Sequence, residues 1–176
     1  MTTMYTSTLG LGLLVARLVI GPVMAAHGAQ KLFGWFGGYG LSQTGEFFAA
    51  LRFRPGRTFA ALASLAEITS GVLVALGFLG PVGPALMISV MLVAMITVHR
   101  ENGLFASGNG VEVPLLYMTA ALGLALTGYG PYALDGVLGI TDRWTPALMW
   151  LVVGTGVLGG LANVAARRRP TAPAGA

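Results

Sequence analysis

Five long apolar runs alternate with short polar connections along the chain, and this pattern predicts the fold. The runs cover residues 9–29, 59–79, 82–98, 113–127 and 146–165. A helix that crosses a bilayer needs about 17 to 25 apolar residues, and the run at 113–127 is on the short side. Backbone groups find no water in lipid, so each run should be helical. The sequence therefore predicts an all-α membrane protein, with a four-helix transmembrane bundle and a fifth C-terminal hydrophobic helix.

The connection at 35–57 is too apolar to be a plain linker and should contain a short helix. Thr44 can cap this helix, which carries Phe47 and Phe48 and is followed by three arginines, Arg52, Arg54 and Arg57. Two interpretations stay open: an interfacial helix against anionic headgroups, or a helix packed on the end of the bundle. Residues 1–169 form one membrane domain in this interpretation, and the Pro/Ala-rich stretch 170–176 is predicted to be a disordered tail.

Composition supports the membrane assignment and excludes several chemistries. Hydrophobic residues make up 55% of the chain and charged residues 9%, and there is no cysteine, which rules out thiol chemistry and cysteine-ligated iron–sulfur clusters in this chain. The formal net charge is +4, but the basic residues flank apolar runs and form no patch with stacking aromatics. They are expected to set topology and meet anionic lipid, and nucleic acid is not an expected partner.

The distribution of Lys and Arg predicts the orientation in the membrane. With five spans, one side carries only Arg143, and the other carries the remaining basic residues outside the spans: Lys31, Arg52, Arg54, Arg57, Arg100 and Arg167–Arg169. The positive-inside rule then places the N-terminus outside and the C-terminus in the cytoplasm.

Ionisable residues inside the spans are the main candidates for function, because such groups are costly in hydrocarbon. Arg17, His27 and Lys31 lie on the first span. Counted from Lys31, His27 lies about 6 Å deeper and Arg17 about 21 Å deeper, while Glu67 on the second span lies roughly 13 Å in. We predict that Glu67 pairs with Arg17, with His27 as the alternative partner. The pair either fixes helix register or belongs to a polar pocket that opens to the cytoplasmic leaflet.

His99 ends the third span near the level of His27, so the two histidines could serve a common ligand. Two facing histidines suit a haem, hydrogen bonds to a quinone ring, or simple capping of helix ends. The absence of a second histidine pair argues against haem, and two nitrogens without cysteine make a poor zinc site. Asp135, in Leu134-Asp135-Gly136, is predicted to be a turn or cap residue at the outer surface.

These residues resemble a known family. The pattern Arg17-x3-Gly21-x5-His27-Gly28-x2-Lys31-Leu-Phe-Gly34, followed by Glu67 with Gly71, then His99, then Gly128-x-Gly-Pro-x-x-Leu134-Asp135, resembles the DoxX family. The resemblance runs from about Leu14 to Gly136. The resemblance implies a four-helix bundle in a bacterial plasma membrane. The family is named after a subunit of a thiosulfate:quinone oxidoreductase, and other members are linked with redox and thiol-stress systems. The run at 146–165 is an addition to that pattern.

The resemblance implies a functional centre near the quinone pool, carried by Arg17, His27, Lys31, Glu67 and His99. The leading hypothesis is a membrane subunit of a redox system that presents a quinone or similar lipophilic molecule to a protein partner on the cytoplasmic side. Glu67 and His27 would handle protons, and the chain would be an accessory of an oxidoreductase rather than an enzyme by itself. The alternatives are a non-catalytic anchor for cytosolic redox or stress enzymes and, more weakly, a small-solute transporter. A homo-oligomer is left open.

Overall fold

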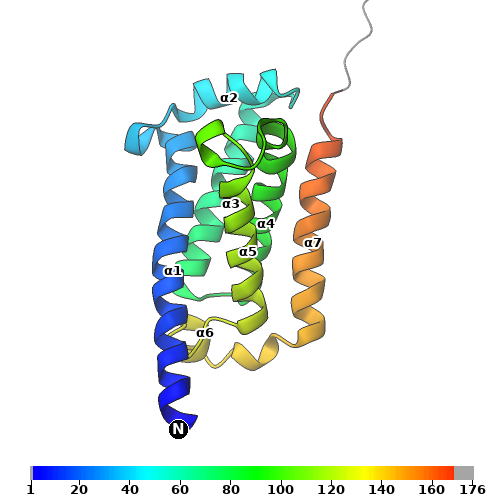
Figure 1. The fold of residues 1–176 in the computed structure, drawn as a ribbon. Coiled ribbons are helices and arrows are strands. Elements are labelled where there is room, and N and C mark those ends of the chain that lie inside the picture. The colour runs from blue at the N-terminus through cyan, green and yellow to red at the C-terminus, as the bar shows by residue number, and fades with distance from the viewer. Residues whose placement is uncertain (1, 169–176) are drawn as a thin grey trace, which may run out of the picture.

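The computed structural model describes residues 2–168, which form an antiparallel array of long helices. The long helices are α1 (Thr2–Phe33), α3 (Gly56–Leu76), α4 (Val82–Ala94), α5 (Glu112–Thr127) and α7 (Pro146–Ala165). Successive helices run in opposite directions, and α7 packs along the outside of α4 (Figure 1). One end of the array carries α2 (Gly40–Ala50), and the other carries the short α6 (Leu134–Val137). The α2 end and the α6 end are named in this sense below.

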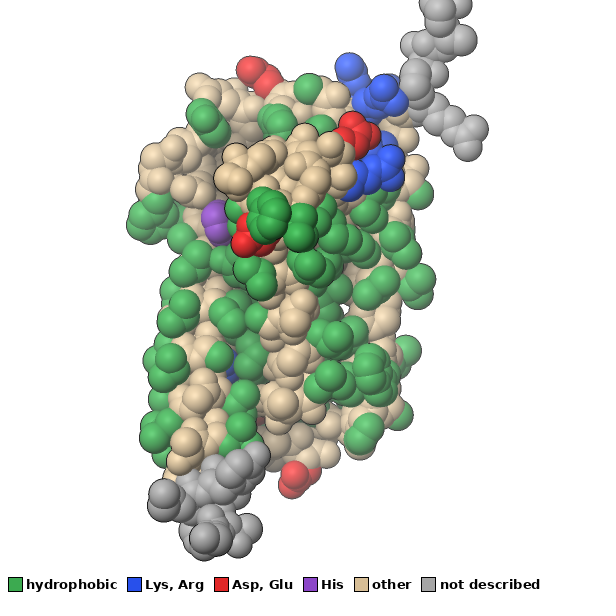
Figure 2. Space-filling view, viewed as in Figure 1, with side chains coloured by type: hydrophobic (Ala, Val, Ile, Leu, Met, Phe, Trp, Pro, Cys, Tyr) green, Lys and Arg blue, Asp and Glu red, His purple; other side chains and the backbone are tan. Residues whose placement is uncertain are grey.

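Within the described residues, four helices are long and apolar enough to cross a membrane: Ser7–Phe33, Gly56–Leu76, Val82–Asn102 and Pro146–Ala165. The predicted all-α membrane fold is thereby confirmed. Helix α5 is apolar but has only 16 residues, in agreement with the short run seen in the sequence. Hydrophobic side chains are spread over the visible flank of the molecule, whereas Lys and Arg are seen mainly at the α2 end and an acidic side chain at the α6 end (Figure 2).

The helix ends follow from local chemistry. Gly77 adopts a left-handed conformation at φ +66° and ends α3 at Leu76, three residues before the end of the apolar run. At the start of α7, the Thr145 side chain accepts a hydrogen bond from the Leu148 amide and Pro146 occupies the first turn. Helix α4 continues through a π-helical segment, Met95–His99, and a 3-10 turn, Arg100–Asn102. The third membrane segment therefore reaches beyond the predicted boundary at residue 98.

Helix α2 lies across the end of the bundle, where it packs against α3 and α1 (Figure 1). The predicted cap at Thr44 is wrong, because the helix begins at Gly40 and Thr44 is buried within it. The Thr44 hydroxyl instead donates to the Lys31 carbonyl, 3.3 Å away. That carbonyl belongs to the last turn of α1, where backbone acceptors have no partner within the helix. The tail predicted at 170–176 lies outside the described residues.

Glycines bring α1 and α3 into backbone contact. A Cβ atom built on Gly21 would lie 2.6 Å from the Gly71 carbonyl oxygen, and one on Gly28 would lie 2.5 Å from the Ser64 carbonyl oxygen. Neither distance leaves room for a side chain, so the helices approach as small-residue interfaces in membranes do. This contact fixes the register of the two helices, with Gly28 beside Ser64 and Ile68. Glu67 therefore lies near the level of His27.

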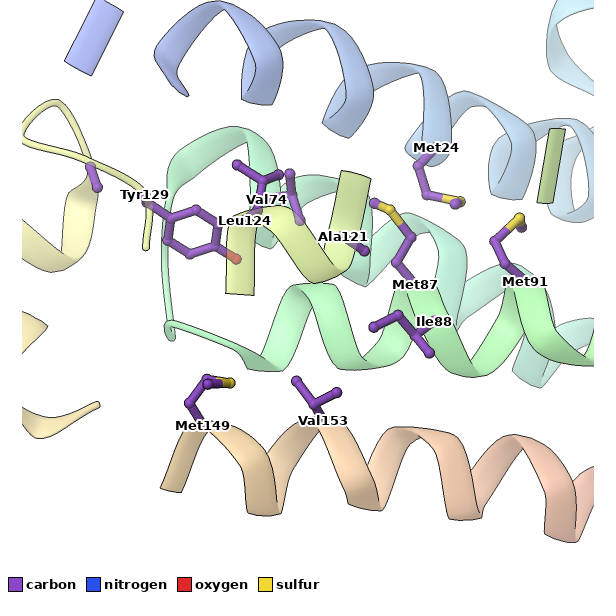
Figure 3. Packing of buried hydrophobic residues seen from close by; sticks show 11 residues of the cluster. Met24, Val74, Met87, Ile88, Met91, Ala121, Leu124, Tyr129, Met149 and Val153 are labelled. Atoms are coloured by element: carbon purple, nitrogen blue, oxygen red, sulfur yellow. The ribbon is translucent and has the colours of Figure 1, made fainter. Parts of the chain in front are cut away.

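The core of the bundle is apolar and rich in methionine. Side chains from α1, α3, α4, α5 and α7 converge there, with Met149 and Val153 of α7 directed at α4 (Figure 3). Met24 and Met87 are fully buried, and their flexible thioethers fill the space between α1 and α4.

Replacing Gly71 with alanine should destabilise the protein by about 1–3 kcal/mol, because the new methyl group would overlap the Gly21 carbonyl oxygen. The measurement is reversible unfolding in mixed detergent micelles. Gly123→Ala is the matched control, since a Cβ at Gly123 meets nothing within 4 Å. Equal stability of the two variants would contradict the backbone contact.

Candidate functional site

An ion pair between Lys31 and Glu67 lies inside the membrane array near the α2 end. The Lys31 ammonium donates to Glu67 Oε1. The Glu67 side chain is completely buried, whereas the Lys31 side chain is 33% exposed. Glu67 Oε2 is also buried and has no hydrogen-bond partner among the described residues. A carboxylate with one free oxygen and a cationic neighbour can accept a further hydrogen bond from a ligand.

The predicted pairing of Glu67 with Arg17 is wrong, and side-chain direction explains the difference. Side chains on a helix lean towards its N-terminus. On α1 this direction carries Lys31 deeper into the bundle and Arg17 towards the α6 end. On the antiparallel α3 it carries Glu67 towards the α2 end. Counting depth along the helix axis places the Glu67 backbone between Arg17 and His27. Because the side chains point towards the helix N-termini, the Glu67 carboxylate meets the Lys31 ammonium instead.

A cavity of about 410 Å³ opens beside the ion pair. We call it the α3–α4 cavity, since most of its wall comes from these two helices, with α2 at one end and one residue from α7. Its walls are largely apolar, with Leu62, Ala66 and Val90 among them. Its polar lining consists of Lys31, Thr44, Glu67, Ser89, Thr97, His99 and Asn163. Such a combination of apolar walls with a few convergent polar groups is typical of small-molecule sites.

His99 belongs to this cavity, but His27 does not line it. His99 Nδ1 lies 2.8 Å from the Asn109 carbonyl oxygen, which can only accept, so Nδ1 carries the proton. In a neutral ring, Nε2 is then an acceptor. His27 instead faces Gln30, with Nδ1 3.3 Å from Oε1, and its ring meets Tyr117 edge-on at 6.0 Å. The structure thus brings together Lys31, Glu67 and His99, while the His27 side chain contacts Gln30 and Tyr117 and does not line the cavity.

Arg17 forms a separate cluster at the α6 end. It is 1% exposed, and its Nη2 donates to the Tyr132 carbonyl oxygen at 3.0 Å. Its guanidinium carbon lies 5.7 Å from the centre of the Tyr129 ring and its Nη1 lies against Gly77. Gly77 follows the last residue of α3, where the helix dipole presents partial negative charge. The dipole and the aromatic face therefore stabilise a buried cation that has no carboxylate within ion-pair distance among the described residues.

Asp135 is buried, contrary to its predicted position at the outer surface. Its carboxylate accepts hydrogen bonds from the Leu79 amide at 2.8 Å, the Gly80 amide at 2.7 Å and Trp144 Nε1 at 3.0 Å. The prediction of a turn residue is correct in kind, but the turn that Asp135 stabilises is the one between α3 and α4. Sequence reasoning could not find these partners, because they lie 9 to 56 positions away.

The sequence analysis did not single out Tyr129, which also belongs to the α6 end and is buried. Burial and the nearby Asp135 carboxylate raise the pKa of its phenol, and the opposing effect of Arg17 is smaller. Tyr129 therefore stays protonated, and its role is to offer Arg17 a neutral aromatic face.

Taken together, these features define a polytopic all-α membrane protein with a buried ion pair at the wall of an apolar cavity. The DoxX family model matches residues 12–100, about half of the chain, and the chain belongs to the DoxX family. The match contains α2, α3, α4, most of α1 and the Lys31–Glu67 pair, while α5, α6 and α7 follow it. Comparisons with curated proteins and with solved structures found no significant match. Among the described residues, no group of three His, Cys, Asp or Glu side chains could hold a metal ion.

Replacing Lys31 with methionine should destabilise the protein by about 3 kcal/mol, because it leaves the fully buried Glu67 carboxylate without its cation; the value is at the low end for a buried pair, since the Lys31 side chain is 33% exposed. The double variant Lys31→Met, Glu67→Leu should recover most of this loss, since both charges are removed. Unfolding of the four members of this double-mutant cycle in mixed micelles measures the coupling. Additive effects would show that the two side chains do not interact.

Asp135→Asn should lower stability by about 1–3 kcal/mol. The carboxylate accepts three N–H hydrogen bonds, and the amide NH₂ of asparagine would face one of these donors with a donor of its own. Asp142→Asn, at an exposed position of the same connection, is the control. The thermal midpoint in detergent should fall for the first variant and stay within error for the second. A similar midpoint for both variants would show that Asp135 does not stabilise the turn between α3 and α4.

Proposed function

We propose that this protein is a membrane subunit of a redox system that binds a quinone, or a similar lipophilic small molecule, in the α3–α4 cavity. The observation that carries the proposal is the Lys31–Glu67 pair in an apolar cavity, with Glu67 Oε2 lacking a partner among the described residues. The volume of about 410 Å³ lies in the range of small-molecule sites.

The polar groups of the cavity fit a neutral head that exchanges carbonyl and hydroxyl forms. Lys31 supplies a donor for a carbonyl oxygen. Glu67 Oε2 and the Nε2 of a neutral His99 supply acceptors for a hydroxyl group. Because the lysine and the glutamate neutralise each other, the cavity favours a neutral ligand over an acid. The ligand's tail would lie against apolar side chains such as Leu62, which is 57% exposed at the flank.

The proposal rests on Lys31, Glu67 and His99. Direct contact of Arg17 or His27 with the ligand is not part of it, since neither lines the cavity. A proton-handling role for His27 stays a prediction. We place the α2 end on the cytoplasmic side of a bacterial plasma membrane, because nearly all basic residues outside the spans lie at this end. The protein partner would then approach the cavity from the cytoplasmic side.

A photoreactive azidoquinone offered to the full chain in lipid nanodiscs tests the proposal. Cross-linked peptides should map to the cavity-lining parts of α3 and α4. Glu67→Gln should reduce labelling about tenfold, the size expected for loss of a hydrogen bond to a charged group. Glu46→Gln, an exposed position on α2 that does not line the cavity, should label like the original protein.

Labelling spread evenly over lipid-facing helices, or equal labelling of the two variants, would overturn the proposal. An anchor that recruits enzymes is the alternative, and the exposure of Arg54 and Arg57 after α2 favours it. An anchor has no need of Glu67, so the same variant separates the two functions.

A further inference from the structure

We propose that a second cavity at the α2 end binds the phosphate-bearing headgroup of an anionic lipid. This arginine cavity has a volume of about 450 Å³ and is polar. Its lining includes Arg52, Arg100, Glu101, Val164 and Arg167. The inference is independent of the quinone proposal, because none of the three residues on which that proposal rests lines this cavity.

Three arginines from distant parts of the chain meet here. Arg52 follows α2, Arg100 follows the π-helical end of α4, and Arg167 follows α7. The single carboxylate in the lining is Glu101, whose side chain is 84% exposed and approaches Arg100 only to 3.9 Å. One loosely paired carboxylate leaves the lining with an excess of positive charge. Lys and Arg side chains are seen together beside the end of α7 (Figure 2).

Arg167 is held in place by contacts that leave its terminal nitrogens for a ligand. Its Nε donates to the Leu51 carbonyl oxygen at 2.8 Å, and its guanidinium carbon lies 5.8 Å from the centre of the Phe53 ring. No hydrogen bond joins its two terminal nitrogens to the described residues. A fixed guanidinium with free terminal donors is the arrangement that binds phosphate oxygens in pairs.

The backbone at Arg52 is also constrained. Its φ of +72° is unusual for a residue other than glycine, and the Arg168 amide donates to its carbonyl oxygen at 3.0 Å. The end of α7 thus holds the segment after α2 at two points, through Leu51 and Arg52. Val164 of α7 and Arg167, which follows this helix, both line the cavity, so the C-terminal end of α7 and the segment after it complete the site.

The position of the cavity favours a lipid over a soluble phosphate compound. The candidate spans Val82–Asn102 and Pro146–Ala165 end at its arginines, which places it at the depth of the headgroups. Leu51, Thr97 and Val98 also line the apolar α3–α4 cavity. A phosphodiester among the arginines would therefore have apolar surface beside it for the start of an acyl chain. Basic pockets between membrane helices bind anionic headgroups in this way.

Titration of the purified full chain in neutral detergent tests the inference. The probes are dioctanoyl phosphatidylglycerol, dioctanoyl phosphatidylcholine and inorganic phosphate, and the binding of each is measured by calorimetry. The anionic lipid should bind more tightly than the other two. Arg52→Gln, Arg100→Gln and Arg167→Gln should each weaken its binding about fivefold, as expected for one arginine near an anionic group.

Arg54→Gln is the matched control, because Arg54 is exposed on the same loop but does not line the cavity. Equal weakening by Arg54→Gln would overturn the inference in favour of non-specific surface charge. Phosphate binding as tight as lipid binding, with the same arginine dependence, would assign the cavity to a free phosphate and overturn the lipid as occupant. If Arg167→Gln lowers the thermal midpoint without lipid, Arg100→Gln carries the test, because the Arg100 side chain is 65% exposed.

Discussion

The backbone contact between α1 and α3 is the constraint on which the rest of the structure depends. Gly21, Gly28 and Gly71 allow the two helices to approach until backbone atoms touch. At that distance the register cannot slide, because any shift would place a side chain against a carbonyl oxygen. The fixed register sets Lys31 opposite Glu67 and Arg17 opposite the end of α3. The positions of the Lys31–Glu67 pair and of Arg17 both follow from this one interface.

The Lys31–Glu67 pair and the Arg17 cluster stabilise buried charge by different interactions. Near the α2 end a cation and an anion neutralise each other, but one carboxylate oxygen has no partner among the described residues and a cavity lies beside the pair. At the α6 end, Arg17 is stabilised by a helix C-terminus, a carbonyl oxygen and an aromatic face. Buried polar atoms without a hydrogen-bond partner among the described residues occur in both clusters: Glu67 Oε2 in the first, and Arg17 Nε, Arg17 Nη1 and the Tyr129 hydroxyl in the second.

Helix α7 adds to the part of the chain that matches the family model. It packs against α4 so closely that a Cβ on Gly156 would strike the backbone of Ala85. It supplies Asn163 to the apolar α3–α4 cavity and Val164 to the arginine cavity, and the segment after it supplies Arg167. A helix added at the flank thereby contributes to two sites at the same end of the bundle.

The sequence by itself determined the fold class, the approximate bounds of the long helices in residues 2–168, and the burial of Arg17 and Glu67, but not that of Asp135. Apolar length and the cost of charge in lipid are properties of single segments, so they can be read without tertiary contacts. The α6 end and the arginine cavity could not be read this way, because Asp135 meets Leu79 and Arg167 meets Leu51 across large sequence separations. Only the tertiary structure decided that Glu67 pairs with Lys31, since the choice depends on helix register and on the direction in which side chains lean.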